Sequence, residues 1–254
     1  MESSSAVHIP VRSISLPSRL HPNFQIIISE LNKLKAWEST VPSASETTQL
    51  GLVGVAQLYN CLQELIHSPL TQKALHHHQY LNLVEEAFDG SVELLDVCGN
   101  ARDLFFLMKE HINDLQSALR RKGGSSIIEG NIQAYISFRK KVKKDITKCL
   151  KTLKRMETMP VTKTKASGWS LVSKLLLTTE RSQKMLNELG AVDAALHTIG
   201  GQIRRNNDAK VDVQEVQKRL GRLDGRVDGF EAELDCLFRC LIQNRASLLN
   251  LVTP

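Results

Sequence analysis

An unbroken series of apolar residues at alternating steps of three and four occupies the last part of this 254-residue chain. It consists of Val213, Val216, Leu220, Leu223, Val227, Phe230, Leu234, Leu237 and Leu241. A sustained mean spacing of 3.5 residues holds one apolar stripe of a helix against a partner helix and implies a left-handed supercoil. We call this stripe the seam. It indicates helix association and no chemistry, so the sequence favours a helical interaction protein.

The partner of the seam has two interpretations. Taking Val213 as heptad position a puts Arg219 and Arg226 at g positions. Asp224 and Glu231 then occupy the following e positions, so both pairs would attract in a parallel homodimer. The seam can equally pack into the chain's own bundle, because helical bundles use the same packing. We favour the intramolecular interpretation, since other amphipathic segments of the chain also need partners, and keep the homodimer as the alternative.

Helical patterns are predicted along most of the remaining sequence. Aromatic residues make up only 5% of the chain, which suits long packed helices better than sheets. We expect the penultimate helix to close at Gly200-Gly201, because glycine pairs are typical helix stops. The predicted fold is all-α, a bundle of long antiparallel helices ending in the heptad-patterned helix, with residues 23–254 forming a single domain.

Residues 1–22 are predicted to be a disordered tail, because they are rich in Ser, Pro and Arg and their prolines prevent a continuous helix. Within it, Arg12 stands three residues before Ser15 and Pro17 two residues after. Phosphorylation of Ser15 would create the pattern read by a phosphoserine reader of the 14-3-3 type, through its Arg-lined groove. The near absence of acids is also typical of a transit peptide, but the prolines interrupt the amphipathic helix such peptides form.

A basic amphipathic helix is predicted in the middle of the chain. Its cationic residues, which we call the basic face, are Arg139, Lys140, Lys141, Lys143, Lys144, Lys148, Lys151, Lys154 and Arg155. The opposite arc of the helical wheel holds Tyr135, Phe138, Val142, Ile146, Cys149, Leu150 and Leu153. A solvated bundle face is the simplest interpretation, because the apolar arc is wide enough to be used up by a core. The alternatives are an acidic protein partner or an anionic membrane surface. Nucleic acid ranks lowest, since no aromatic platform accompanies the charges.

No spacing in the sequence indicates catalysis, a metal or a cofactor. The consecutive histidines 76–78 point in different directions on a helix, and the Cys236/Cys240 pair lacks a second pair of ligands. Phosphate-binding loops, nucleophile elbows and HExxH motifs are absent from the sequence. Five cysteines form an odd set of the kind expected for reduced thiols. We therefore expect a non-enzymatic cytoplasmic protein, with a plastid or peripheral-membrane location as alternatives.

Four segments taken together resemble a plant-specific family of helical proteins that includes the BYPASS type. They are residues 8–22, 65–75, 88–98 and 237–250. The tail motif Arg-Ser-Ile-Ser-Leu-Pro at 12–17 is similar to the family's own signature. The resemblance implies a regulatory or structural role in root and shoot development, exerted through protein partners, and it implies no reaction. The best-known branch of the family is associated with plastids.

Overall fold

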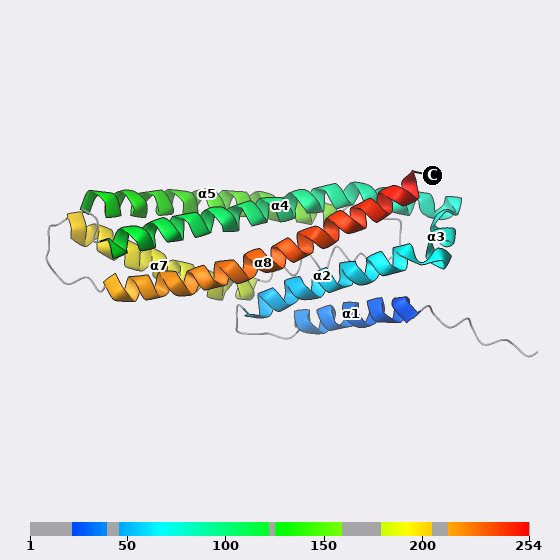
Figure 1. Cartoon of the computed structure of the whole chain (residues 1–254), viewed down its shortest axis with the longest axis horizontal. Coiled ribbons are helices and arrows are strands. Elements are labelled where there is room, and N and C mark those ends of the chain that lie inside the picture. Colours follow the sequence, from blue (N-terminus) through cyan, green and yellow to red (C-terminus); the bar gives the residue numbers. More distant parts are fainter. Residues whose placement is uncertain (1–21, 40–45, 122–124, 159–178, 205–212, 254) are drawn as a thin grey trace, which may run out of the picture.

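The chain forms a bundle of long α-helices, as expected (Figure 1). The computed structural model describes residues 22–39, 46–121, 125–158, 179–204 and 213–253. Within these ranges the helices are α1 (Pro22–Ser39), α2 (Glu46–His67), α3 (Pro69–Leu75), α4 (His78–Arg120), α5 (Ser125–Thr158), α7 (Thr179–Arg204) and α8 (Val213–Val252). With 40 residues, α8 is about 60 Å long at 1.5 Å per residue, so one helix spans most of the bundle. Residues 1–21 of the predicted tail lie outside the described residues, and its last residue, Pro22, begins α1.

Local sequence explains where the chain turns between α2 and α4. Ser68 is extended, with ψ 128°, and Pro69 opens α3, where its fixed φ suits the first helical turn. His77 is extended again, with ψ 136°, before α4 begins. The chain therefore reverses its direction over the seven-residue α3, and α4 runs antiparallel to α2 (Figure 1).

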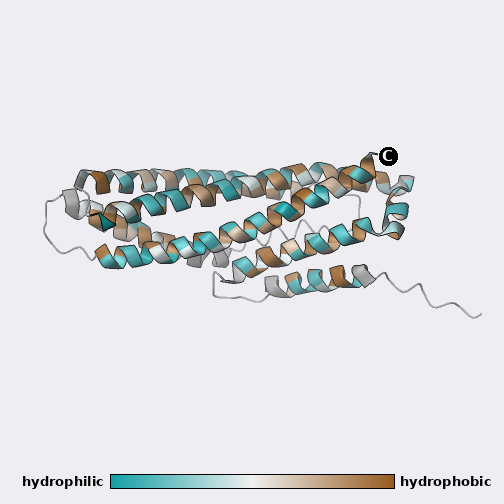
Figure 2. Cartoon of the chain, in the orientation of Figure 1, coloured by the Kyte–Doolittle hydropathy of each residue, from teal (hydrophilic) through white to brown (hydrophobic). Residues whose placement is uncertain are grey.

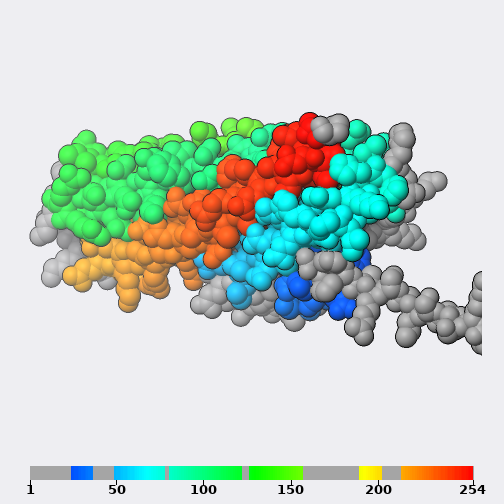
Figure 3. All heavy atoms as spheres, turned by 45° about the vertical axis from the view of Figure 1, so that its right-hand side comes forward, coloured from blue at the N-terminus to red at the C-terminus, as the bar shows by residue number. Residues whose placement is uncertain are grey.

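Helix α8 runs through the middle of the bundle, between α4 on one side and α2 on the other (Figures 1 and 3). It is antiparallel to α4, because Lys109 Nζ lies 2.5 Å from Asp228 Oδ1 while the earlier Arg102 pairs with the later Asp235. Phe105 of α4 and Phe230 of α8 stack between these ion pairs, with ring centroids 5.4 Å apart. In contrast, α8 and α2 run in the same direction, since both are antiparallel to α4 (Figure 1).

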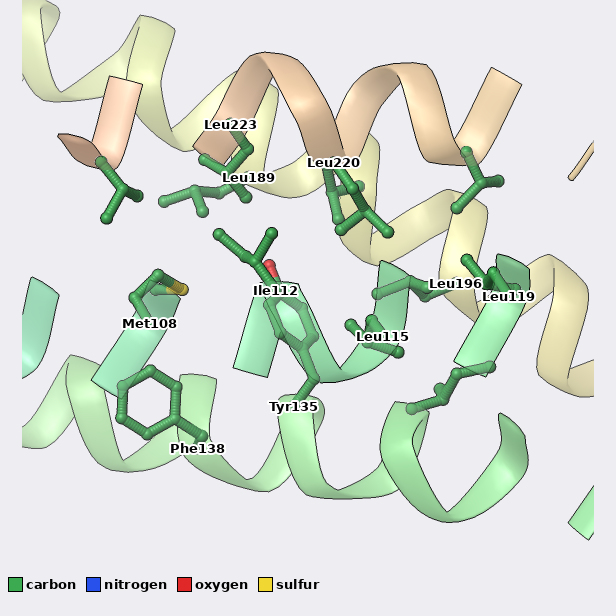
Figure 4. Packing of buried hydrophobic residues seen from close by; sticks show 14 of the residues in the cluster. Met108, Ile112, Leu115, Leu119, Tyr135, Phe138, Leu189, Leu196, Leu220 and Leu223 are labelled. Atoms are coloured by element: carbon green, nitrogen blue, oxygen red, sulfur yellow. The ribbon is translucent and has the colours of Figure 1, made fainter. Parts of the chain in front are cut away.

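The seam lies in the core of the chain along its whole length. Its first half packs against α4, α5 and α7, where Leu220 and Leu223 face Ile112, Leu115 and Tyr135 (Figure 4). Its second half, from Phe230 to Leu241, packs against α2 and α4, with contributions from Leu34 of α1 and from Leu153 and Met156 of α5. Apolar and polar residues alternate along each ribbon accordingly (Figure 2). Helix α2 thus covers the second half of α8 as α7 covers the first.

The structure of the single chain uses the seam inside its own bundle. Val213 is half-buried and packs against the core, and the other seam residues are buried. Among the four flanking charges that could have linked a homodimer, Arg219 and Glu231 have partners within the chain. Arg219 Nε donates to Glu215 Oε1 at 2.8 Å, and Glu231 Oε2 lies 3.4 Å from Lys109 Nζ on α4.

One predicted helix end is wrong. Helix α7 continues through Gly200-Gly201 to Arg204 instead of closing at the glycine pair. Packing overrides the local preference here: the side chain of Ile132 on α5 lies 4.0 Å from where a Cβ of Gly200 would stand, and the preceding Ile199 is buried. A glycine inside a helix costs about 1 kcal/mol relative to alanine, which the burial of such neighbours offsets.

Candidate functional site

The apolar face of α5 is largely occupied by the core. Tyr135, Phe138, Val142 and Leu153 are all buried against α4 or its neighbours, and Phe138 contacts the ring of His111 at a centroid distance of 4.6 Å. Ile146 is the exception, with 46% of its surface exposed. The fold therefore leaves chiefly the polar side of α5 facing solvent.

The basic face covers that polar side. From Lys140 to Arg155 its members are exposed, as predicted from the helical wheel. Arg139 differs, because it turns towards α7, where its Nε lies 3.7 Å from Asp193 Oδ1. Tyr135 lies beside this ion pair, and burial, followed by the nearby Asp193 carboxylate, raises the pKa of its hydroxyl. Arg139 is thus part of the contact between α5 and α7 and does not belong to the exposed surface.

Two further members of the basic face have acidic partners. Lys148 Nζ lies 2.9 Å from Asp145 Oδ1 within α5, and Arg155 Nη2 lies 2.9 Å from Glu93 Oε1 on α4. The remaining members form no ion pair in the described part of the chain; they are Lys140, Lys141, Lys143, Lys144, Lys151 and Lys154. We call these six the lysine face. Concentrated, unpaired positive charge on a rigid helix is suited to binding an acidic surface.

Sequence reasoning missed a buried polar cluster near the C-terminal end of α8. Asn244 is only 3% exposed, and its Nδ2 donates to the backbone oxygens of Tyr59 at 2.8 Å and Cys240 at 2.9 Å. The prediction followed apolar residues and stopped at Leu241. The signal was nevertheless present, because Leu237, Asn244 and Leu251 continue one heptad column. A single buried asparagine in such a column typically fixes helix register.

Arg245 joins this cluster to α4. Its Nη1 donates to the backbone oxygen of Phe88 and to Ser91 Oγ, both at 2.7 Å, and its guanidinium lies 3.9 Å from the centre of the Phe88 ring. On the opposite side, Ser247 Oγ lies 3.4 Å from His67 Nε2 on α2. These contacts tie α2, α4 and α8 together, which indicates a structural role.

Two of the thiols, Cys98 and Cys240, are buried. Burial raises the pKa of Cys98 to about 11, and it raises the pKa of Cys240, whose thiol lies 3.1 Å from Asn60 Oδ1. A thiol with a raised pKa is a poor nucleophile at neutral pH. No group of three or more His, Cys, Asp or Glu side chains could hold a metal ion there. Nor does any described helix combine the length and apolarity needed to cross a membrane.

The sequence matches the family model described as Protein BPS1 over residues 51–162 and 157–251. The chain belongs to this family. The resemblance to BYPASS-like proteins is thereby confirmed, and membership suggests a role in plant developmental regulation without specifying a mechanism. No curated protein and no solved structure matches the chain.

The family match includes both structural features described above. The basic face lies in the first matched range and the seam in the second. Three of the four segments that carry the resemblance, residues 65–75, 88–98 and 237–250, supply His67, Phe88 and Arg245 to the buried polar cluster. The fourth segment lies outside the match, and its Arg12, Ser15 and Pro17 lie outside the described residues.

Proposed function

We propose that this chain is a non-enzymatic regulatory adaptor of plant development that binds an acidic protein surface through the lysine face of α5. The observation that supports this most strongly is the combination of six exposed lysines, which have no ion pair among the described residues, with an apolar face already buried in the core. A helix in this state can bind through charge while the bundle behind it stays folded. In this proposal the basic face binds a partner, whereas its simplest interpretation was a bundle face in contact with solvent only.

An acidic protein is favoured over an anionic membrane because of what α5 has already buried. Amphipathic helices that bind membranes insert their apolar face into the boundary between headgroups and acyl chains. In this chain Phe138, Val142 and Leu153 are in the core, so only headgroup attraction of about 1 kcal/mol per lysine would remain. An acidic helix or loop can instead pair directly with lysines held in a fixed pattern.

The absence of a reaction is part of the proposal. Among the described groups, the largest pKa increases belong to buried hydroxyl and thiol groups, Tyr59, Tyr135 and Cys98. Burial is the main cause in each case, and it makes these groups less ready to ionise at neutral pH. They fit a packed interior better than an acid–base or nucleophilic site. We also propose a cytoplasmic location, which suits the odd set of reduced thiols.

Titration of a fluorescent glutamate-rich peptide into the full-length protein tests the proposal. We expect Lys140→Gln/Lys144→Gln/Lys151→Gln to weaken binding about tenfold or more, because each exposed pair contributes up to about 1 kcal/mol. The matched control removes three exposed lysines elsewhere, Lys35→Gln/Lys73→Gln/Lys218→Gln, and should bind like the wild type. Equal losses in the two triple variants would contradict a specific lysine face.

Vesicles containing phosphatidylserine provide the second arm of the same experiment. The proposal predicts weak flotation that moderate salt abolishes, since attraction between exposed charges is screened within about 10 Å at 0.1 M. Flotation that persists in salt and is tighter than peptide binding would favour the membrane interpretation instead.

Control through the tail belongs to the same proposal. Purification of the wild type and of Ser15→Ala from plant tissue, followed by mass spectrometry, should show a phosphoserine reader bound only to the wild type. An identical set of partners would remove the tail from the mechanism and leave the lysine face unaffected.

A further inference from the structure

The outer side of α4 carries a column of acidic residues next to the lysine face. Asp89, Asp96, Asp103 and Glu110 are spaced by seven residues and are all exposed. Residues seven apart on a helix point in nearly the same direction, so these four carboxylates form one line. No basic side chain pairs with them in the described part of the chain. We call this line the acidic column.

The ion pair between Glu93 and Arg155 marks the border between α4 and α5 on this side. Asp96 stands almost one turn after Glu93, on the flank away from the core, because the opposite flank holds the buried Val97. Lys151 is likewise about one turn from Arg155 on the exposed flank of α5. Helix α5 lies beside α4 (Figure 1), so the acidic column of α4 and the exposed Lys144 and Lys151 of α5 belong to the surface that these two helices form.

Contacts between the antiparallel helices α4 and α5 show which of their residues lie at the same height along the bundle. Glu93 lies level with Arg155, and His111 lies level with Phe138. Interpolation between these contacts puts Asp96 level with Lys151 and Asp103 level with Lys144. Heptad spacing is shared by both lines, so the match extends over more than one turn. Asp96 and Asp103 thus each have a lysine of α5 at their level, and all four side chains are exposed, so their charges are available to a partner.

We infer that this surface pairs with the same surface of a second copy of the chain. This inference rests on the proposed function, because it uses the lysine face and names its acidic partner. A twofold axis parallel to α4 and α5 would lay each acidic column over the other copy's lysines at matching levels, with Asp96 against Lys151 and Asp103 against Lys144. A twofold axis across the helices would oppose like charges, so the pattern selects one arrangement.

Apolar residues beside the acidic column add to this fit. Val92 and Phe106 are 41% and 54% exposed and flank the column at the same side of α4. A surface with charge alone associates weakly, whereas covered aromatic area supplies a hydrophobic contribution. The seam has no part in this dimer, since it is used within each chain.

Sedimentation equilibrium of the full-length protein tests the inference. At about 0.05 M salt the mass should rise with concentration from 28.4 kDa towards twice that value, and at about 0.5 M salt it should return to a single chain. A wild type that stays at 28.4 kDa in low salt overturns the inference.

Charge reversal identifies the surface. Lys144→Glu/Lys151→Glu makes both lines acidic, and Asp96→Lys/Asp103→Lys makes both basic, so each variant alone should dimerise at least about a hundredfold more weakly. An equimolar mixture of the two variants should regain the dimer, which also shows that both fold. The control Lys35→Glu/Lys73→Glu should dimerise like the wild type. Unchanged dimerisation of either test variant alone, or no recovery in the mixture, overturns the inference.

Failure of this inference can be distinguished from failure of the proposed function. A wild type that never dimerises but binds the glutamate-rich peptide through Lys140, Lys144 and Lys151 would overturn only the self-association. Absence of both dimer and peptide binding would overturn both. Competition between the peptide and the dimer, seen as a mass that falls when peptide is added, would support both together.

Discussion

Helices α5 and α8 are both long and amphipathic, but the bundle uses them differently. The seam of α8 is buried by α2, α4, α5 and α7, so its association is already satisfied within the chain. Helix α5 buries its apolar side in the same way but leaves the six residues of the lysine face without acidic partners among the described residues. The lesson is that a strong heptad identifies the core of a bundle, whereas unbalanced charge identifies the surface left for a partner.

A substitution within the seam should lower the free energy of unfolding more than any other change considered for this comparison. Leu220 is fully buried, so Leu220→Asp should cost about 4 kcal/mol or more and unfold much of the population at room temperature. Circular dichroism during urea unfolding measures the loss. Leu249→Asp, at an exposed position of the same helix, is the control and should stay near the wild-type stability. A folded monomer of Leu220→Asp would show that the seam serves association between chains.

The second-largest loss of stability is expected for substitution of the buried Asn244. Asn244→Ala removes the donor to the backbone oxygens of Tyr59 and Cys240 and should cost about 1–3 kcal/mol. Asn250→Ala, on the exposed side of α8, should change the free energy of unfolding by less than about 0.5 kcal/mol. Equal effects would mean that the polar cluster does not position α2 against α8. Urea unfolding of the two variants in parallel decides between these results.

A smaller effect is expected at Asp224, beside the seam. Burial, followed by repulsion from Asp228, raises the pKa of Asp224, and its buried Oδ1 has no hydrogen-bond partner among the residues that the structure describes. The folded state therefore binds this proton more tightly than the unfolded state. The resulting stabilisation is present below the ordinary pKa of 3.8 and is lost as pH rises through the raised value.

At neutral pH, Asp224→Asn should therefore be slightly more stable than the wild type, by about 0.5 kcal/mol or less. The gain should shrink as the pH is lowered below the raised pKa. Thermal unfolding of the wild type and variant between neutral and acidic pH measures this. A gain that grows on acidification would reverse the assigned sign and refute the role of burial.

The lysine face should have the smallest effect on folding. Lys140→Gln/Lys144→Gln/Lys151→Gln should change the free energy of unfolding by less than about 0.5 kcal/mol, because these side chains are exposed and unpaired within the described chain. Urea unfolding provides the measurement. A loss of several kcal/mol would show that these lysines hold the bundle together, and the contrast between α5 and α8 would then fail.

Periodicity was enough to predict the all-α bundle, the seam and the amphipathic α5. It reports which side of a helix is apolar, but not which helix will cover that side. The parallel alignment of α2 with α8 was therefore not predicted, nor was the turn of Arg139 towards Asp193. Asn244 and Arg245 were missed because a polar residue looks like the end of an apolar pattern, although their donors are satisfied inside the fold.

The acidic column shows a different limit. Its heptad spacing is visible in the sequence, but its meaning depends on the register between α4 and α5, which Glu93 and Arg155 reveal only in three dimensions. The packing of α4 against α5 brings the charges of these two helices together in one surface. Glycine pairs illustrate the same point, since Gly200-Gly201 lies inside α7 because of its tertiary neighbours.

Lysine footprinting tests the central claim most directly. The full-length protein is acetylated briefly with and without the glutamate-rich peptide, and the modification of each lysine is read by mass spectrometry. We predict that the peptide slows acetylation of Lys140, Lys144 and Lys151 and leaves the exposed Lys35, Lys73 and Lys218 unchanged. Equal protection of both sets, or none at the lysine face while the peptide is bound, would contradict the claim that α5 presents the binding surface.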